Sequence, residues 1–366
     1  MTTTGWSRLW SWTNIVPALA VLALILTWGR SLGVVVVAIV AVILAAAVLA
    51  AVHHAEVVAA RVGEPFGSLV LAVSVTVIEV SLIVTLMISG QPAETASLAR
   101  DTVFAAVMIT TNGIVGLSLL AGAVKYGTVL FNAEGAGAAL ATVASLATVC
   151  LVLPRFTGQP GSQFEPSQLA FAAIASLVLY AAFVVTQTVR HRAFFLPVTE
   201  EGETVEPEKY AESPPTRTAV FSLVLLLASL VSVVGLAKVE SPAIEQGVAA
   251  AGFPRSFVGV VIALLVLLPE TLAAFRAALR NRLQISLNLA LGSAMASIGL
   301  TIPTIAVASI WLEGPLVLGL EPTQIVLLAL TVVVGALTVV PGRATRLQGS
   351  VHLVLLAVFL FLSVNP

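Results

Sequence analysis

The chain has 366 residues, of which 59% are hydrophobic and only 10% are charged, and its net charge is -1. This composition excludes an ordinary soluble domain and indicates a protein that crosses a membrane many times. The near-zero net charge also argues against a nucleic-acid partner, because binding to phosphates needs a basic surface. The single cysteine, Cys150, cannot form an intrachain disulfide, and we expect it to be apolar filler.

Eleven apolar segments approach the roughly 20 residues that a helix needs to cross the hydrocarbon core. The first follows Arg8, as the apolar part of a signal peptide would, but no A-x-A cleavage site follows it. We therefore predict an all-α polytopic membrane protein with eleven transmembrane helices. In chain order the segments are 15–30, 34–52, 66–89, 101–122, 136–154, 167–189, 218–237, 256–276, 284–311, 322–340 and 350–364.

The basic residues predict how these helices are oriented, since short loops rich in Lys and Arg stay on the cytoplasmic side. With the N-terminus inside, twelve basic residues fall on the inner face and five on the outer face. An odd number of helices then places the C-terminus outside.

Only one long segment is polar, residues 190–217, which contain six glutamates and four prolines. Acidic, proline-rich chain cannot bury a core, so we expect a solvated cytoplasmic linker. The alternative is a weak calcium sensor, although no EF-hand spacing is present. The predicted organisation is an extra helix in 1–33, a five-helix repeat in 34–189, the linker, and a second five-helix repeat in 218–366.

The two repeats each contain an apolar helix with one glutamate, followed by a helix of small and hydroxyl residues. Glu79 lies in "VSVTVIEVSLIV" on the third predicted helix, and Glu270 lies in "LLVLLPETLAAF" on the eighth. Because these helices are five apart, they run in opposite directions, which is an inverted repeat. Such repeats place ion sites near the bilayer midplane, where helices are often interrupted. Pro269 is one predicted interruption, and the Asn-Gly pair at 112–113 and the "GLTIP" sequence at 299–303 are expected to loosen two further helices.

A glutamate at the centre of a spanning helix costs roughly 3 kcal/mol, which suggests a function. Two partly desolvated carboxylates would let protons and a hard cation compete for the same oxygens. An all-oxygen site suits Ca²⁺ or an alkali cation better than zinc or copper, and we expect no cofactor. The competing interpretation is that the glutamates and serines serve helix packing. The predicted metal ligands are Glu79, Glu270, Thr76, Thr110, Asn112, Ser293 and Ser297.

Several segments resemble the ChaA-type cation/proton antiporters of the Ca²⁺:cation antiporter superfamily. They are "HHAEVVAARVGEPFGSLVLAVSVTVIEVSLIVTLM", "RDTVFAAVMI", "LLPETLAAFRAALRNRLQISLNLALGSAMASIGLTIP" and the acidic loop. The resemblance covers nearly the whole chain. It implies the sodium/calcium exchanger-like fold, with one extra helix before two inverted five-helix repeats, and a multi-pass protein of the bacterial inner membrane. It also implies that the family's paired ion-binding glutamates fall on Glu79 and Glu270.

One departure concerns selectivity. Many calcium/proton exchangers of the superfamily have a Gly-Asn pair before each glutamate, where this chain has Val75-Thr76 and Val266-Leu267. The ChaA-type branch shares this loss, which leaves fewer side-chain oxygens for Ca²⁺ and leaves the choice among Ca²⁺, Na⁺ and K⁺ open.

The predicted function is secondary active exchange of cytoplasmic Ca²⁺, with Na⁺ or K⁺ as further cations, for protons by alternating access. The alternatives are a monovalent Na⁺/K⁺ proton antiporter, a cation channel and an intramembrane enzyme. Channels usually form their filters by symmetry among subunits. The chain's aspartates lie at helix ends and H-E-x-x-H is absent, so we predict no enzyme. The expected partners are the lipid bilayer, the transported cations and protons, with a homo-oligomer as an alternative to a monomer.

Overall fold

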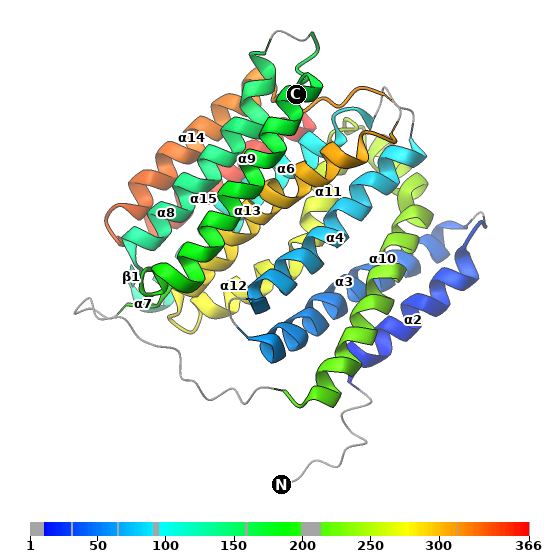
Figure 1. Ribbon diagram of the computed structural model, residues 1–366, viewed down its shortest axis with the longest axis horizontal. Coiled ribbons are helices and arrows are strands. Elements are labelled where there is room, and N and C mark those ends of the chain that lie inside the picture. The colour runs from blue at the N-terminus through cyan, green and yellow to red at the C-terminus, as the bar shows by residue number, and fades with distance from the viewer. Residues whose placement is uncertain are drawn as a thin grey trace. The chain divides into compact units, whose positions relative to one another are not determined.

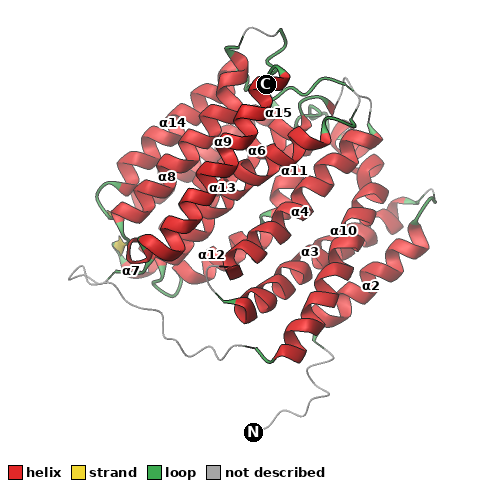
Figure 2. Ribbon diagram, viewed as in Figure 1, coloured by secondary structure: helices red, strands yellow, loops and turns green. Residues whose placement is uncertain are grey.

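The computed structural model describes residues 11–365 apart from 31, 64–65, 91–94, 158–159, 199–213 and 313. Nearly all of the described chain is helical (Figure 2). The described strands are β1 (Val129–Leu130) and β2 (Arg343–Ala344), which pair antiparallel. The chain forms two compact units, one from residues 1–91 and 212–252 and the other from 92–211 and 253–366. Each unit therefore draws on both halves of the sequence.

The first unit is a group of four long helices that lie side by side (Figure 1). Its longest helix, α10, packs along the other three, and at Gly235 it approaches Leu24 so closely that an added methyl would clash. Small residues allow this close approach of helices in lipid. The helices are α2 (Trp12–Thr27), α3 (Val34–Val62), α4 (Phe66–Ser89) and α10 (Thr216–Ala250).

The second unit is built around the span Leu98–Tyr126, whose apolar window is 89% buried. This span is α6, a π-helix η1 and α7 in sequence, and it packs against α11, α13 and α15 (Figure 1). In chain order the helices of this unit are α6 (Leu98–Met108), η1 (Ile109–Ile114), α7 (Val115–Tyr126), α8 (Ala133–Ala147), η2 (Thr148–Val152), η3 (Leu153–Arg155), α9 (Pro166–Val185), η4 (Thr186–Arg190), η5 (Arg192–Phe195), α11 (Phe257–Val266), α12 (Leu268–Ala278), α13 (Leu283–Ala308), α14 (Pro322–Val339) and α15 (Arg346–Val364).

Two helices of this unit begin with the same N-terminal capping motif. Glu165-Pro-Ser-Gln168 starts α9 and Glu321-Pro-Thr-Gln324 starts α14, each as a capping box with proline at the first helical position. In both, the glutamine side chain accepts a hydrogen bond from the backbone N–H of the glutamate at 2.9 Å. The capping box determines where these helices begin, because its side chains accept hydrogen bonds from backbone N–H groups that have no partner within the helix.

Every predicted apolar segment coincides with a helix, so the multi-pass, helical architecture is confirmed. Within the described residues, eight helices are long and apolar enough to cross a membrane, or nine when the bent pair of α11 and α12 counts as one span. The shorter apolar helices Trp12–Thr27 and Val73–Ile88 coincide with two further predicted segments. The count of eleven and the inverted repeat stay predictions.

Two helices extend well beyond their predicted ends. The apolar stretch of α3 ends near residue 52, but the helix runs to Val62 because "HHAEVVAARV" contains no Gly or Pro. It stops at Gly63, whose φ of 77° few other residues adopt. Likewise α10 continues from the predicted residue 237 to Ala250, with Pro242 inside it. Hydropathy locates the part of a helix that lies in lipid, and the helix itself can continue into the interface. Most of the predicted acidic linker, residues 199–213, lies outside the described residues.

Candidate cation site

Glu79 and Thr76 lie one turn apart on α4, in the first unit. Glu79 sits near the middle of this 24-residue helix and is 3% exposed, and Thr76 is 7% exposed. The helix packs against α3 and α10. The surrounding helix is mostly apolar, with hydroxyl side chains as its other polar groups near Glu79, so burial of a carboxyl group here carries the cost that marks intramembrane acidic residues as candidates for function.

The second unit places Glu270 directly after a break in a membrane span. Helices α11 and α12 are bent by 55° at Leu267, and Glu270 lies in the first turn of α12. Pro269 has no N–H, so it cannot donate to the carbonyl of Leu265 four residues earlier. Thr271 donates its hydroxyl to the carbonyl of Leu267 at 2.7 Å. The predicted interruption before Glu270 is therefore present.

The π-helix η1 contains two of the predicted ligands, Thr110 and Asn112, both fully buried. The amide of Val115 donates to the carbonyl of Thr110, five residues back. The hydroxyl of Thr110 donates its hydrogen to the carbonyl of Ala106 at 2.8 Å. The lone pairs of the Thr110 hydroxyl oxygen therefore remain available to a cation. The Asn-Gly sequence thus loosens the helix into a wider turn, and π-bulges of this kind are frequent at functional sites.

The side chain of Asn112 lies in a buried network between three helices. Its Nδ2 donates to Oγ1 of Thr331 on α14 at 2.9 Å, and its Oδ1 is 3.0 Å from Nδ1 of His352 on α15. The other ring nitrogen of His352, Nε2, is 3.1 Å from Oγ1 of Thr338. The side-chain oxygen of Asn112 has two lone pairs. One accepts from His352, so the other remains available to a further partner.

Helix α13 carries Ser293 and Ser297, one turn apart. Ser297 is 3% exposed, while Ser293 is partly exposed. The helix continues without interruption through Gly299 and Pro303 to Ala308, although the sequence suggests a looser stretch there. It packs against both η1 and α12, and η1 also contacts α12. The second unit therefore brings together the helices that carry Thr110, Glu270 and the two serines.

Donor chemistry at these positions favours a hard cation. Among the residues that the structure describes, no group of three His, Cys, Asp or Glu side chains comes together. The candidate donors at these positions are single carboxylates, hydroxyls and backbone carbonyls, which suit Ca²⁺, Na⁺ or K⁺.

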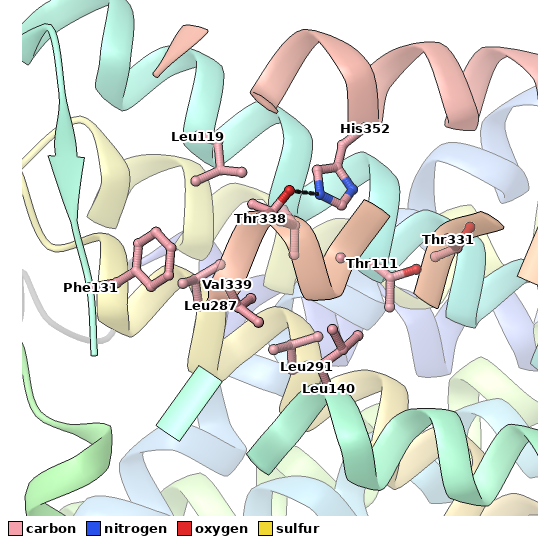
Figure 3. A pocket seen from close by; sticks show the side chains of 12 residues that line it. Thr111, Leu119, Phe131, Leu140, Leu287, Leu291, Thr331, Thr338, Val339 and His352 are labelled. Carbon is pink, nitrogen blue, oxygen red and sulfur yellow. Dashed lines mark hydrogen bonds between the residues drawn. The ribbon is translucent and has the colours of Figure 1, made fainter. Parts of the chain in front are cut away.

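A small cavity lies beside the Asn112 network (Figure 3). Its volume is about 20 Å³, which is room for about one water molecule. His352, Thr338 and Thr331 line it, together with mainly apolar side chains of η1, α7, α8, α13 and α14. The cavity is too small and too apolar to be an ion binding site itself.

A larger cavity of about 200 Å³ lies elsewhere in the same unit. It is bordered by a charged cluster in which Arg100 Nε donates to Asp101 at 2.8 Å and Arg100 Nη1 contacts Glu321 at 3.3 Å. Ser97 donates to the second oxygen of Asp101 at 2.8 Å. Asp101 is therefore a paired structural group at the start of α6, as its position at a helix end suggests.

Sequence reasoning missed His352, which is 2% exposed inside the apolar helix α15. The available signal was the same one that singles out the glutamates, namely an ionisable residue within a spanning segment.

Comparison with known proteins identifies the family. The family model described as "Sodium/calcium exchanger protein" matches residues 30–189 and 221–365. The protein y4hA of Sinorhizobium fredii is 45% identical over 98% of this chain and 96% of its own length. The sodium-potassium/proton antiporter ChaA of Escherichia coli is 33% identical over 94% of each chain.

Two solved structures share the fold at 16% identity. They are native YfkE, with a TM-score of 0.71 over 97% of this chain and 99% of that one, and the H⁺/Ca²⁺ exchanger CAX, with a TM-score of 0.70 over 95% and 86%. The resemblance read from the glutamate segments is confirmed by these matches. The chain therefore belongs to the sodium/calcium exchanger protein family and is a multi-pass membrane protein that exchanges cations.

Proposed function

We propose that the protein exchanges a cytoplasmic cation for protons by alternating access, and that Ca²⁺ is the cation it binds most tightly. The observation that carries this proposal is the placement of one glutamate on a membrane helix of each unit, Glu79 within α4 and Glu270 at the break between α11 and α12. Each carboxyl group can hold a proton or contribute a negative charge to a cation. Proton binding and cation binding then exclude each other, which couples the two fluxes.

Charge balance favours a divalent cation. Two ionised glutamates neutralise one Ca²⁺, and two protons neutralise the same pair when the cation has left. A monovalent cation would leave one negative charge uncompensated in a partly desolvated site, where such a charge is costly. Exchange of two protons for one Ca²⁺ is electroneutral, so the pH gradient alone would drive it.

A monovalent exchanger is the second candidate. The positions before the glutamates are Val75-Thr76 and Val266-Leu267, so they offer one hydroxyl and no amide oxygen. The relative that is 33% identical is named a sodium-potassium/proton antiporter. Two protons per Na⁺ or K⁺ would carry net charge and draw on the membrane potential at about 2.3 kcal/mol per charge per 100 mV.

Transport in proteoliposomes separates these candidates. The purified protein is reconstituted, a pH gradient is imposed, the potential is clamped, and Ca²⁺, Na⁺ and K⁺ are offered in turn. We expect Ca²⁺ to drive proton movement at the lowest concentration, with a rate that does not depend on the potential. Proton movement with Na⁺ or K⁺ that Ca²⁺ neither supports nor inhibits would overturn the calcium assignment and retain the antiporter. Cation flux without proton counterflow would indicate a channel.

The role of the glutamates is tested by Glu79→Gln and Glu270→Gln. A glutamine keeps the size of the side chain but cannot exchange a proton for a cation, so each variant should lose exchange while it still folds. Glu134→Gln is the matched control, because Glu134 is exposed in the first turn of α8 and should tolerate the change. Wild-type exchange in either buried-site variant would rule out the central role of that glutamate.

A further inference from the structure

His352 belongs to a hydrogen-bonded chain whose directions can all be assigned. Asn112 Oδ1 only accepts hydrogen bonds, so the ring nitrogen 3.0 Å away, Nδ1 of His352, must carry a hydrogen and donate it. In the neutral ring Nε2 then accepts, and the hydroxyl of Thr338 at 3.1 Å donates to it. At the other end Asn112 Nδ2 donates to Thr331 at 2.9 Å. Both polar ends of the Asn112 side chain are thus held by neighbouring helices.

The approach of α15 to the span Leu98–Tyr126 places His352 opposite Asn112. A methyl added at Gly116 would lie 2.9 Å from Cβ of His352, and one added at Gly349 would lie 2.9 Å from the carbonyl oxygen of Gly116. Gly116 is one turn after Asn112, and Gly349 is one turn before His352. Two glycines therefore let the backbones touch at the level where the histidine reaches the asparagine.

The anchored residue lies on the segment that presents a candidate ligand. Thr110 and Asn112 are two residues apart in η1, and residues with this spacing point to opposite sides of a helix. Holding Asn112 toward α14 and α15 consequently turns Thr110 away from them.

We propose that His352 is a positioning residue for cation exchange. Its hydrogen bond to Asn112 fixes the rotation of residues 109–114 and hence the direction in which the oxygen of Thr110 faces. The proposal rests on the proposed function, because it takes Thr110 as a cation ligand. It requires a hydrogen-bond donor at the position of Nδ1 and no change of protonation at His352.

The test compares His352→Asn with His352→Gln in reconstituted exchange. An asparagine carries its amide nitrogen on Cγ, as histidine carries Nδ1, so it can still donate to Asn112. A glutamine carries its amide one bond further out, where it replaces Nε2 instead. We expect His352→Asn to stay within about threefold of wild type, and His352→Gln to raise the cation concentration for half-maximal exchange about tenfold, with a similar maximal rate.

A double-mutant cycle shows whether His352 acts through Asn112. On an Asn112→Ala background, His352→Gln should cause no further change, because the acceptor is already gone. An additional tenfold loss on that background would overturn the proposal, as would equal impairment of His352→Asn and His352→Gln, or normal exchange by His352→Gln.

The wild-type protein provides a measurement that does not depend on folding of a variant. The ¹⁵N signals of His352, assigned by their absence in His352→Asn, should show hydrogen on Nδ1 and none on Nε2. The opposite tautomer would overturn the proposal. Absence of any cation/proton exchange by wild type would overturn the proposed function and this proposal together, whereas wild-type exchange with the wrong histidine pattern overturns this proposal alone.

Discussion

Replacement of Gly349 by alanine should separate α15 from α7 and break the hydrogen bond between His352 and Asn112. The new methyl group would lie 2.5 Å from the amide nitrogen of Leu120 and 2.9 Å from the carbonyl oxygen of Gly116. Both obstacles are backbone atoms, so no side chain can turn aside. Relief to an ordinary contact of about 3.5 Å needs a shift of about 1 Å between the helices. His352, one turn further along α15, would move with Gly349, and its 3.0 Å contact with Asn112 would exceed hydrogen-bond range.

The expected destabilisation combines two effects. Overpacking of a close interface costs about 1–3 kcal/mol. A buried polar atom left without its partner costs about 1–3 kcal/mol. Because both effects follow from one helix shift, they do not add fully, and we expect about 2–4 kcal/mol in total.

The assay is thermal unfolding of the purified protein in detergent, followed by exchange in proteoliposomes. Gly137→Ala is the matched control, because Gly137 is also a helical glycine of the second unit but has no atom within 4 Å of the added methyl. That variant should be as stable as wild type, or more stable by about 0.5–1 kcal/mol. A Gly349→Ala protein that melts no lower than Gly137→Ala would refute the close-packing argument.

Three further predictions concern the rest of the chain. Arg100→Leu should destabilise the protein by about 3–5 kcal/mol, because it leaves the buried Asp101 without its cation. The control is Arg155→Leu. The side chain of Arg155 is partly exposed and 3.9 Å from Glu321, so its loss should cost less than about 1 kcal/mol in the same melting assay. Deletion of residues 200–213 should leave exchange within a few-fold of wild type, since a solvated linker contributes little to the fold; loss of a calcium-dependent activation on deletion would favour the sensor alternative. The N-terminus should be cytoplasmic and the C-terminus outside, and a C-terminal reporter that is active only in the cytoplasm would contradict this orientation.

The helices could be predicted from the sequence because each apolar run must satisfy its backbone internally once it enters lipid. The two glutamates could be singled out because an ionisable side chain in such a run is costly, although helix packing stayed an alternative explanation. Helix ends were less predictable, because "HHAEVVAARV" is polar enough to leave the lipid and still a good helix former. Capping boxes such as Glu321 to Gln324 mark the starts of helices far more clearly than hydropathy marks their ends.

Other features depend on contacts between distant parts of the chain. The grouping of α10 with α2, α3 and α4 joins the second half of the sequence to the first, and no local pattern records it. The Asn-Gly pair predicts a loosened helix, but that the loosening takes the form of the buried π-helix η1, with Asn112 anchored to another helix, depends on tertiary contacts. Packing of Gly116 against α15 likewise determines that His352 meets Asn112, and this cannot be read from either helix alone.

The bend at Leu267 also has a mechanical consequence. Helix α11 packs on α6, whereas α12 packs on α13 and α7, so the two halves of this span are anchored to different neighbours. At 1.5 Å per residue, Glu270 is about 4.5 Å from the bend and Ala278 about 16 Å from it. A rotation of about 20° at this joint would then move Glu270 by about 1.5 Å and the far end of α12 by almost 6 Å. A rotation at this joint would therefore displace the far end of α12 far more than Glu270, the candidate cation ligand beside the bend.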